Sequence, residues 1–237
     1  MQVGWLDARV KRGMAAQMME LARAEASGAR VMGWKVGFGA PAAMDKLGLQ
    51  APVVGHLLAS ARIVPGASVD TRGWVKPVVE PEVAVILVRD LDGSEDRATV
   101  RAAIGALAPA LELADLCFPP EDIERIVAGN IYQRHVMFGP SIALRPSEPG
   151  AVLLPELGAR VWHGQSPLAV PASLHALTGD PVDIVAHVAK TLAACGRCLR
   201  SGESVITGSI VPPVFGAAGD TVRYVLDPAG EIVVTLG

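Results

Sequence analysis

Three glutamates in otherwise apolar sequence are the residues of this chain best suited to carry chemistry. Glu80 and Glu82 stand two residues apart in KPVVEPEVAVIL (76–87), which has the composition of a buried strand. Side chains alternate between the two faces of a strand, so both carboxylates point to the same face. Burying them there costs roughly several kcal/mol each unless they are paired, protonated or bound to a metal.

A third carboxylate comes from the segment PALELAD (109–115), in which Glu112 stands alone among apolar residues. We expect 110–114 to form a strand beside the first one, which would bring the three carboxylates together. Such an all-oxygen site suits Mg²⁺ or Mn²⁺, and a 2-oxo acid could fill two of its open positions. The alternative is an edge strand whose glutamates face solvent, which Pro81 would favour because it cannot donate to a ladder.

The pattern along the chain predicts the elements that must position these residues. Strands outnumber helices and lack a regular alternation with them, so we expect an α+β roll or distorted barrel and not a doubly wound sheet. The expected helices begin near Leu6, behind a cap at Ser94, after Pro119 and Pro120, and behind Asp180. The second of these would carry Val100, Ile104 and Leu107 on one stripe. The main expected strands cover 78–88, 110–114, 205–210 and 221–226.

The composition excludes several classes of protein. At 237 residues with a net charge of −3, the chain fits one globular domain, and its interleaved charges give no basic block for nucleic acid. No apolar run reaches the roughly 20 residues that a bilayer requires, and the amino-terminal stretch does not read as a signal peptide. We therefore expect a soluble, cytoplasmic protein. Cys195 and Cys198 form a lone CxxC that could be a redox pair, half of a zinc site, or two small apolar residues at a helix end.

Four segments, taken together, resemble one known family. They are GWKVG (33–37), VEPEVAVIL (79–87), PALELAD (109–115) and ITGSIVPPVFGAAGDTV (206–222). In this order they are similar to the 2-keto-4-pentenoate hydratase family, within the fumarylacetoacetate hydrolase superfamily. The resemblance implies the β-roll of that superfamily's carboxy-terminal domain, as a single catalytic domain over 1–237. Residues 1–28 would be a helical extension, shorter than is usual in the family.

The resemblance also implies a function and a set of site residues. It implies a metal-dependent lyase acting on a small 2-oxo acid, most simply a hydratase that converts a 2-hydroxy-2,4-dienoate into a 4-hydroxy-2-oxo acid. Decarboxylation or tautomerisation of such an acid is the alternative. The metal, Mg²⁺ or Mn²⁺, would be bound by Glu80, Glu82 and Glu112. The expected substrate-binding residues are Lys35, Asn130, Thr207, Gly208 and Ser209, and Lys35 would also be catalytic.

The sequence departs from the family where an acid/base group is expected. The family usually has an aspartate at the position of Val53, and a hydrocarbon cannot move protons; a second acidic position falls on Gly129. His56 could replace the aspartate, since imidazole titrates near neutral pH. The chain could instead catalyse a less demanding reaction, or bind metal and ligand with little turnover. The apolar stripe of the first helix makes a homo-oligomer plausible.

Overall fold

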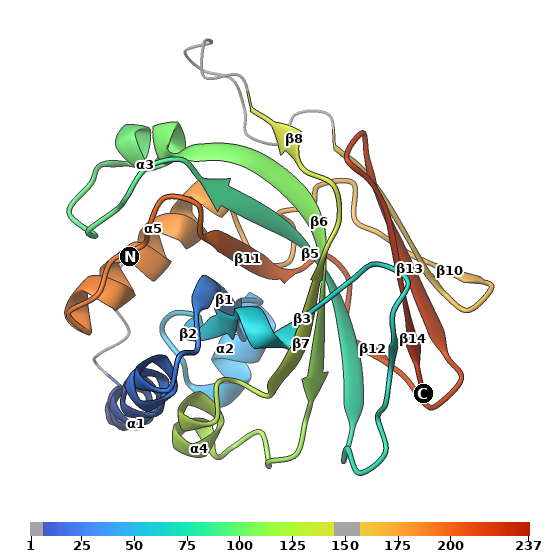
Figure 1. Cartoon of the computed structure of the whole chain (residues 1–237), viewed down its shortest axis with the longest axis horizontal. Coiled ribbons are helices and arrows are strands. Elements are labelled where there is room, and N and C mark those ends of the chain that lie inside the picture. The colour runs from blue at the N-terminus through green and yellow to red at the C-terminus, as the bar shows by residue number, and fades with distance from the viewer. Residues whose placement is uncertain (1–6, 145–156) are drawn as a thin grey trace.

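The computed structural model describes residues 7–144 and 157–237 (Figure 1). Two sheets form the body, with helices against the larger one. The helices are α1 (Ala8–Ala26), α2 (Pro41–Leu47), α3 (Arg97–Ala103), α4 (Ile123–Ala128) and α5 (Pro181–Ala194), with a 3-10 turn at Ala59–Ala61. The strands of the larger sheet are β1 (Val31–Gly37), β2 (Val53–Leu58), β3 (Arg62–Ile63), β5 (Pro77–Leu87), β6 (Ile104–Asp115), β7 (Gln133–Phe138), β8 (Ile142–Ala143), β11 (Ser204–Ser209) and β12 (Val214–Phe215). The smaller sheet contains β4 (Ser68–Val69), β9 (Gly158–His163), β10 (Ser166–Leu168), β13 (Thr221–Asp227) and β14 (Gly230–Leu236).

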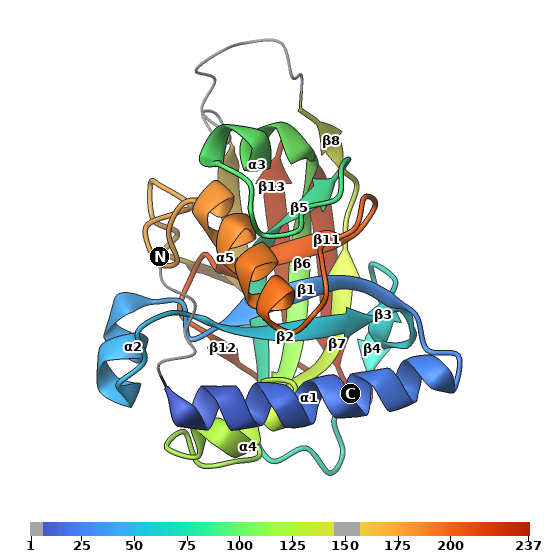
Figure 2. The same ribbon diagram turned by 90° about the vertical axis from the view of Figure 1, so that its left-hand side faces the viewer.

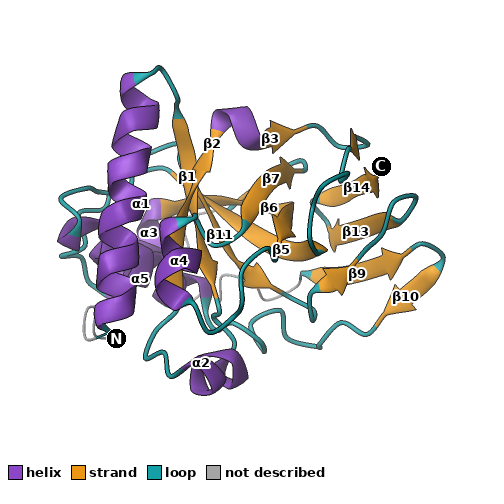
Figure 3. Cartoon of the chain, turned by 90° about the horizontal axis from the view of Figure 1, so that it is seen from below, coloured by secondary structure: helices purple, strands orange, loops and turns teal. Residues whose placement is uncertain are grey.

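The larger sheet is curled into a half-barrel, which confirms the expected α+β roll. Its strands follow the order β2-β1-β11-β5-β6-β7-β3, with β12 paired to β5 and β8 to β6. The smaller sheet has the order β10-β9-β13-β14-β4. Helices α1, α3, α4 and α5 gather at one side of the molecule and the smaller sheet lies at the other (Figure 3). The long central strands β5 and β6 therefore lie between two covering layers.

The pairing of β5 with β6 brings the glutamates together. These strands are antiparallel, and their register runs from Pro77 opposite Asp115 to Leu87 opposite Ile104. Odd-numbered residues of β5 such as Val79, Val83 and Val85 pack into the main hydrophobic core. Because side chains alternate, the even-numbered residues of β5 point to the other face, which is the inner face of the curl. We call this the concave face.

The sequence pattern was misleading between the two central strands. The expected helix with Ile104 and Leu107 on one stripe is wrong: α3 ends at Ala103 and Ile104 begins β6. Its cap is Asp96, whose side chain accepts from the Thr99 backbone N–H, and not Ser94. Pairing with β5 extends the strand through residues whose local spacing also fits a helix, because tertiary contacts outweigh weak local preferences.

The amino-terminal helix α1 packs on the chain's own body. It crosses below β2 beside α4 (Figure 2), and its apolar stripe, including Met14 and Leu21, is buried. Its close approach to α4 requires Gly13, since a Cβ there would lie 2.7 Å from the Glu124 carbonyl oxygen. The buried Gln17 amide donates to the carbonyls of Val54 and Val127 at 3.2 and 2.7 Å. The stripe is thus used within the chain and gives no support for self-association.

Two further sequence expectations can be compared with the fold. The first expected helix starts near Leu6, which lies outside the described residues. The described helix α1 begins at Ala8, behind a cap formed by the Asp7 side chain. Among the described helices, none has the length and apolar character that a membrane span requires.

Candidate metal centre

The three glutamates converge on the concave face. Glu80 lies directly opposite Glu112 across β5 and β6, and Glu82 lies one step further along the same face of β5. One carboxylate oxygen from each residue lies within 4.8 Å of the others. Glu82 and Glu112 are buried and Glu80 is half-buried. The alternative in which these side chains face bulk solvent is therefore wrong.

A lysine completes this carboxylate cluster. Lys35 is buried on β1, and its ammonium group forms an ion pair with Glu112. The same group donates to the carbonyl oxygen of Ile131 at 3.1 Å. Lys35 lies opposite Gly55 on β2, where any side chain would come within 3.1 Å of the Lys35 Cγ atom. Gly55 is therefore needed for the lysine to reach across the concave face.

Burial governs the protonation of the carboxylate cluster. It raises the pKa of Glu80, and it raises the pKa of Glu82 well above the ordinary value, with repulsion from Glu112 and Glu80 adding to the shift. Burial also raises the pKa of Glu112 to about 7, although the Lys35 charge opposes the increase. These shifts share one cause, since removal from water disfavours the charged form of each carboxyl group. Full ionisation of the cluster thus requires more positive charge than Lys35 supplies.

The donor set of the carboxylate cluster fits a divalent cation. When ionised, three carboxylates and one ammonium leave a formal charge of −2, which a divalent ion would neutralise. The Oε2 atom of Glu112 is buried and has no hydrogen-bond partner, so it is available as a ligand atom. Carboxylate oxygens without histidine or cysteine are the ligands that Mg²⁺ and other hard cations prefer. Among the described residues, this is the only group of three or more candidate metal ligands.

The segment Thr207–Ser209 lies beside Glu82. The Gly208 backbone N–H donates to Glu82 Oε2 at 2.5 Å. Gly208 has a φ of +92°, and a Cβ there would lie 2.6 Å from the Thr178 side chain. The Thr207 hydroxyl donates to the Val83 carbonyl at 2.9 Å, and Ser209 Oγ makes a longer contact of 3.3 Å to the Pro81 carbonyl. Gly208 and Ser209 are therefore better placed to contact a ligand than Thr207, because the Thr207 hydroxyl already donates to the Val83 carbonyl of β5.

His56 does not face the carboxylate cluster. It lies opposite Trp34, whereas Lys35 lies opposite Gly55, so the alternation of side chains directs His56 to the other face of the sheet. Burial lowers its pKa to about 4, and the nearby Arg197 charge adds to the decrease. The expectation that His56 replaces the missing aspartate is therefore corrected: its position on the strand turns a neutral imidazole away from the carboxylates.

Asn130 links the turn after α4 to the backbone of β2. Its Oδ1 accepts from the His56 backbone N–H at 2.8 Å, and its Nδ2 donates to the His56 carbonyl at 2.9 Å. The same nitrogen lies 3.4 Å from Gln133 Oε1. The backbone of β2 thus uses one acceptor site and one N–H of this amide, and the expected substrate contact of Asn130 stays a prediction.

The turn that contains Asn130 has an unusual backbone. Asn130, Ile131 and Tyr132 have φ values of 60°, 54° and 63°, the left-handed region that L residues rarely adopt in succession. This conformation presents the Ile131 carbonyl to Lys35. Asparagine tolerates the left-handed region, so the sequence held a weak signal at Asn130, but nothing in it indicated the same backbone for Ile131 and Tyr132.

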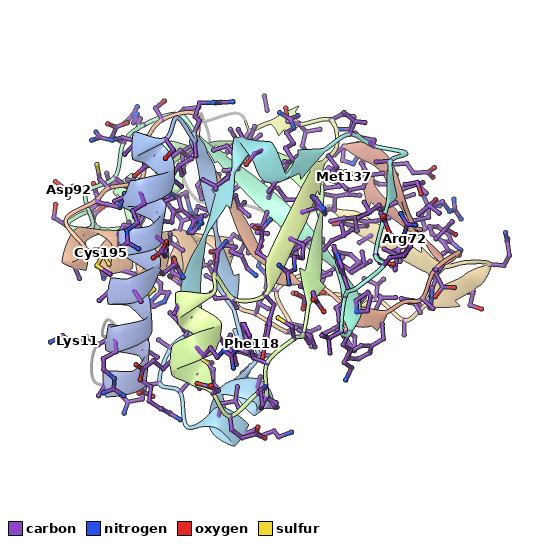
Figure 4. The ribbon with its side chains drawn as sticks, turned by 60° about the horizontal axis from the view of Figure 1, so that its bottom comes forward. Lys11, Arg72, Asp92, Phe118, Met137 and Cys195 are labelled. Atoms are coloured by element: carbon purple, nitrogen blue, oxygen red, sulfur yellow. The ribbon has the colours of Figure 1, made fainter. Side chains whose placement is uncertain are left out.

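The two positions that lack the family's acidic residues differ in location. Val53 lies opposite Gly37 and so shares the face of Lys35, with 1% of its surface exposed. Gly129 ends α4, where a Cβ would lie 3.2 Å from the ring of Phe118 (Figure 4). A hydrocarbon at position 53 thus shares the face of Lys35, whereas Gly129 packs against an aromatic side chain.

The CxxC pair lies at and just beyond the end of α5. Cys195 lies at the end of α5 (Figure 4), and both it and Cys198 are free thiols. Neither belongs to a group of candidate metal ligands within the described ranges. The zinc interpretation of this motif has no further ligand there.

Known proteins are similar to this chain in sequence and in fold. No family model matches it. The 2-hydroxyhexa-2,4-dienoate hydratase of Comamonas testosteroni is 31% identical over 211 residues, which make up 87% of this chain and 78% of the relative. The 2-keto-4-pentenoate hydratase of Paraburkholderia xenovorans is 26% identical over 229 residues, or 95% and 83% of the two chains. The chain belongs to the 2-keto-4-pentenoate hydratase family, within the fumarylacetoacetate hydrolase superfamily.

Decarboxylases are also similar to this member of the 2-keto-4-pentenoate hydratase family. The structure of 4-oxalocrotonate decarboxylase from Pseudomonas putida G7, complexed with calcium and acetate, superimposes with a TM-score of 0.84 at 26% identity. The superposition covers 95% of this chain and 85% of the decarboxylase. A second structure of that enzyme is complexed with magnesium and adipate. Divalent cations therefore occur in close structural neighbours of this hydratase-family chain.

Proposed function

We propose that the protein is a divalent-metal-dependent hydro-lyase. Its substrate would be a 2-hydroxy-2,4-dienoate of the 2-keto-4-pentenoate type, and its product a 4-hydroxy-2-oxo acid. The observation that carries this proposal is the convergence of Glu80, Glu82 and Glu112 beside Lys35, in a family whose similar members include dienoate hydratases.

The proposed metal ligands are the carboxylates of Glu80, Glu82 and Glu112. Their hard oxygen atoms favour Mg²⁺ or Mn²⁺. When bound, such an ion would polarise the keto oxygen of the substrate and stabilise the negative charge that develops there during reaction.

The chain's own residues would bind the acid and move its protons. The Lys35 ammonium is buried and charged, so it can hold the substrate carboxylate in a site of low polarity. Lys35 also contacts the carboxylate cluster directly, through its ion pair with Glu112. Its Nζ atom is therefore the proposed carrier of a proton during the reaction. Ser209 can exchange its long contact with the Pro81 carbonyl for a bond to a substrate oxygen.

Decarboxylation is the second candidate, and Val53 favours it. Hydration requires both a base for water and an acid for carbon, and position 53 supplies neither. Loss of CO₂ from a conjugated 2-oxo acid leaves the bonding electron pair in the conjugated system, and only one proton must return to carbon. A site that relies on Lys35 alone could meet that smaller demand, and the similarity to a 4-oxalocrotonate decarboxylase is compatible with it.

An ultraviolet assay separates the two candidates. The purified protein is mixed with 2-hydroxypenta-2,4-dienoate or with 4-oxalocrotonate, with Mg²⁺ or with a chelator. Metal-dependent loss of the dienol absorbance supports hydration, and metal-dependent formation of CO₂ supports decarboxylation. The variant Glu82→Gln should lose turnover while Glu231→Gln, which changes an exposed side chain of β14, retains it. Absence of both reactions at high protein concentration would reject the lyase proposal.

Assembly and location remain predictions. A homo-oligomer can be tested by light scattering after size-exclusion chromatography, and a cytoplasmic location by cell fractionation. The packing of α1 on its own chain removes one argument for a homo-oligomer.

A further inference from the structure

A cavity lies on the concave face, away from the carboxylate cluster. It has a volume of about 550 Å³, and Ile86 and Ala108 contribute to its wall. Ile86 and Glu82 point to the same face of β5 but are four residues apart, or about 13 Å along an extended strand. Small and apolar buried side chains, among them Ala84 and Ala110, fill the space between. The cavity is therefore separate from the candidate metal centre.

The wall of the cavity combines apolar side chains with cationic ones. Met32, Ile86 and Phe138 supply the apolar surface, and Arg30 and Arg62 supply guanidinium groups. The Arg62 guanidinium lies 6.0 Å from the centre of the Phe138 ring. Cationic and apolar groups thus line the same space, which is the arrangement that an amphipathic anion requires.

Arg30 and Arg62 have no acidic partner among the residues that the structure describes. A third arginine of the wall, Arg200, is instead paired with Asp90 at 2.8 Å. The positive charge of the first two side chains is therefore not neutralised within this part of the chain.

The acidic side chain in the wall is already engaged. Glu203 Oε2 accepts from the indole N–H of Trp34 at 3.0 Å and from the backbone N–H of Arg200 at 2.9 Å. Both bonds hold the Oε2 atom on Trp34 and the Arg200 backbone, and no ion pair joins Glu203 to Arg30 or Arg62 among the described residues. The cavity keeps a positive balance and can attract an anion from solution.

We propose that this cavity binds a small organic carboxylate with an apolar chain. The carboxylate would contact Arg30 and Arg62, and the chain would lie on Met32, Ile86 and Phe138. The volume lies within the range of about 300–1,000 Å³ that is usual for small-molecule sites. The apolar wall selects an organic acid over inorganic phosphate, which has no surface to bury there. This site does not depend on the proposed reaction.

Calorimetric titration with hexa-2,4-dienoate tests the proposal. This probe has the carboxylate and the apolar chain but lacks the 2-oxo group that would direct it to a metal, and the protein is kept in chelator. We expect saturable binding in the millimolar range or tighter that weakens as salt is added. Hexa-2,4-dien-1-ol and inorganic phosphate should bind much more weakly.

Variants identify the site that binds the probe. Arg30→Gln and Arg62→Gln should each weaken binding about fivefold, and the double variant more than tenfold. Arg72→Gln changes an exposed arginine that is paired with Asp70 outside the cavity, and it should bind as the wild type does. Circular dichroism confirms that each variant is folded.

Several results would overturn the proposal. They are the absence of saturable binding to the wild type, unchanged binding to the double variant, and loss of binding in Glu82→Gln, which would locate the probe at the carboxylate cluster. Self-association that depends on Arg30 and Arg62 while probe binding does not would show that the cavity receives a second copy of the chain instead.

Discussion

The side-chain amide of Asn130 forms hydrogen bonds with both backbone groups of His56. The distances are 2.8 Å from the His56 nitrogen to Oδ1 and 2.9 Å from Nδ2 to the carbonyl oxygen. Gly55 precedes His56 and faces Lys35, and the residue after Asn130 supplies the carbonyl that accepts from the same lysine. This one amide therefore holds together the two segments that surround the Lys35 side chain.

Replacing Asn130 should disturb Lys35. Asn130→Gly keeps the left-handed backbone available but removes two partly buried hydrogen bonds, which we expect to cost about 1–3 kcal/mol in the free energy of urea unfolding. Turnover should fall because Lys35 loses its fixed position. Asn130→Asp should do the same, since a carboxylate cannot donate to the His56 carbonyl. Full stability and full activity in both variants would contradict the role described here.

Position 53 offers a gain-of-function experiment. Val53→Asp places a carboxylic acid on the face of Lys35, where the family usually has one, and should increase the rate of dienoate hydration. Val53→Asn is the matched control, because asparagine has a shape similar to that of aspartate but cannot exchange a proton. The acid should also lower stability by a few kcal/mol, roughly, because it is buried. Equal hydration rates in the two variants would argue against a need for an acid at this position.

Removal of one carboxylate should have opposite effects with and without metal. Metal-free Glu82→Gln should be at least as stable as the wild type, because the change removes a buried carboxyl group whose ionisation is disfavoured and keeps an oxygen for the Gly208 N–H. Saturating Mg²⁺ should stabilise the wild type, by about 2.7 kcal/mol at one hundred times Kd, but not the variant. Differential scanning fluorimetry measures both effects, with Glu231→Gln as the control. An unchanged Mg²⁺ response in Glu82→Gln would remove this residue from the ligand set.

His56 should make the fold sensitive to mild acid. Its pKa is about 4 in the folded protein and near 6.5 when the chain is unfolded, so the unfolded state takes up the proton first as the pH falls. The linkage predicts a loss of about 2 kcal/mol of stability from this group between pH 7 and pH 5. His56→Gln should show a smaller loss over the same interval in urea unfolding.

His163→Gln is the comparison for that experiment. His163 is half-buried and lies 3.0 Å from Asp220, so the change should leave the acid sensitivity caused by His56 in place. The same pH dependence in His56→Gln as in the wild type would show that other groups, such as the buried His187, cause it.

The sequence predicted the members of the carboxylate cluster better than it predicted their surroundings. Alternation on a strand placed Glu80 and Glu82 on one face, and the apolar setting of Glu112 indicated a neighbouring strand. The register that sets Glu80 opposite Glu112 depends on the whole length of β5 and β6, so local pattern could not supply it. The same long pairing converted Ile104 and Leu107 from expected helix into strand.

The error at His56 and the unforeseen structural role of Asn130 have a different origin. A residue three positions past Val53 points to the opposite face of a strand, so its distance in sequence from the expected acid was misleading. The role of Asn130 depends on a turn with three successive positive φ values, two of them at bulky residues. The packing around the turn fixes this backbone conformation, and the residue types alone do not predict it.

The bonds of Gln17 have a practical consequence for work on this protein. One amide on α1 serves the carbonyls of Val54, which precedes Gly55, and Val127, which lies three residues before Asn130. A shortened version that starts after residue 28 would remove the Gln17 donor from both oxygens, next to the segments that surround the lysine. Removing the first helix to aid crystallisation should therefore impair turnover, although no atom of that helix needs to approach the organic acid.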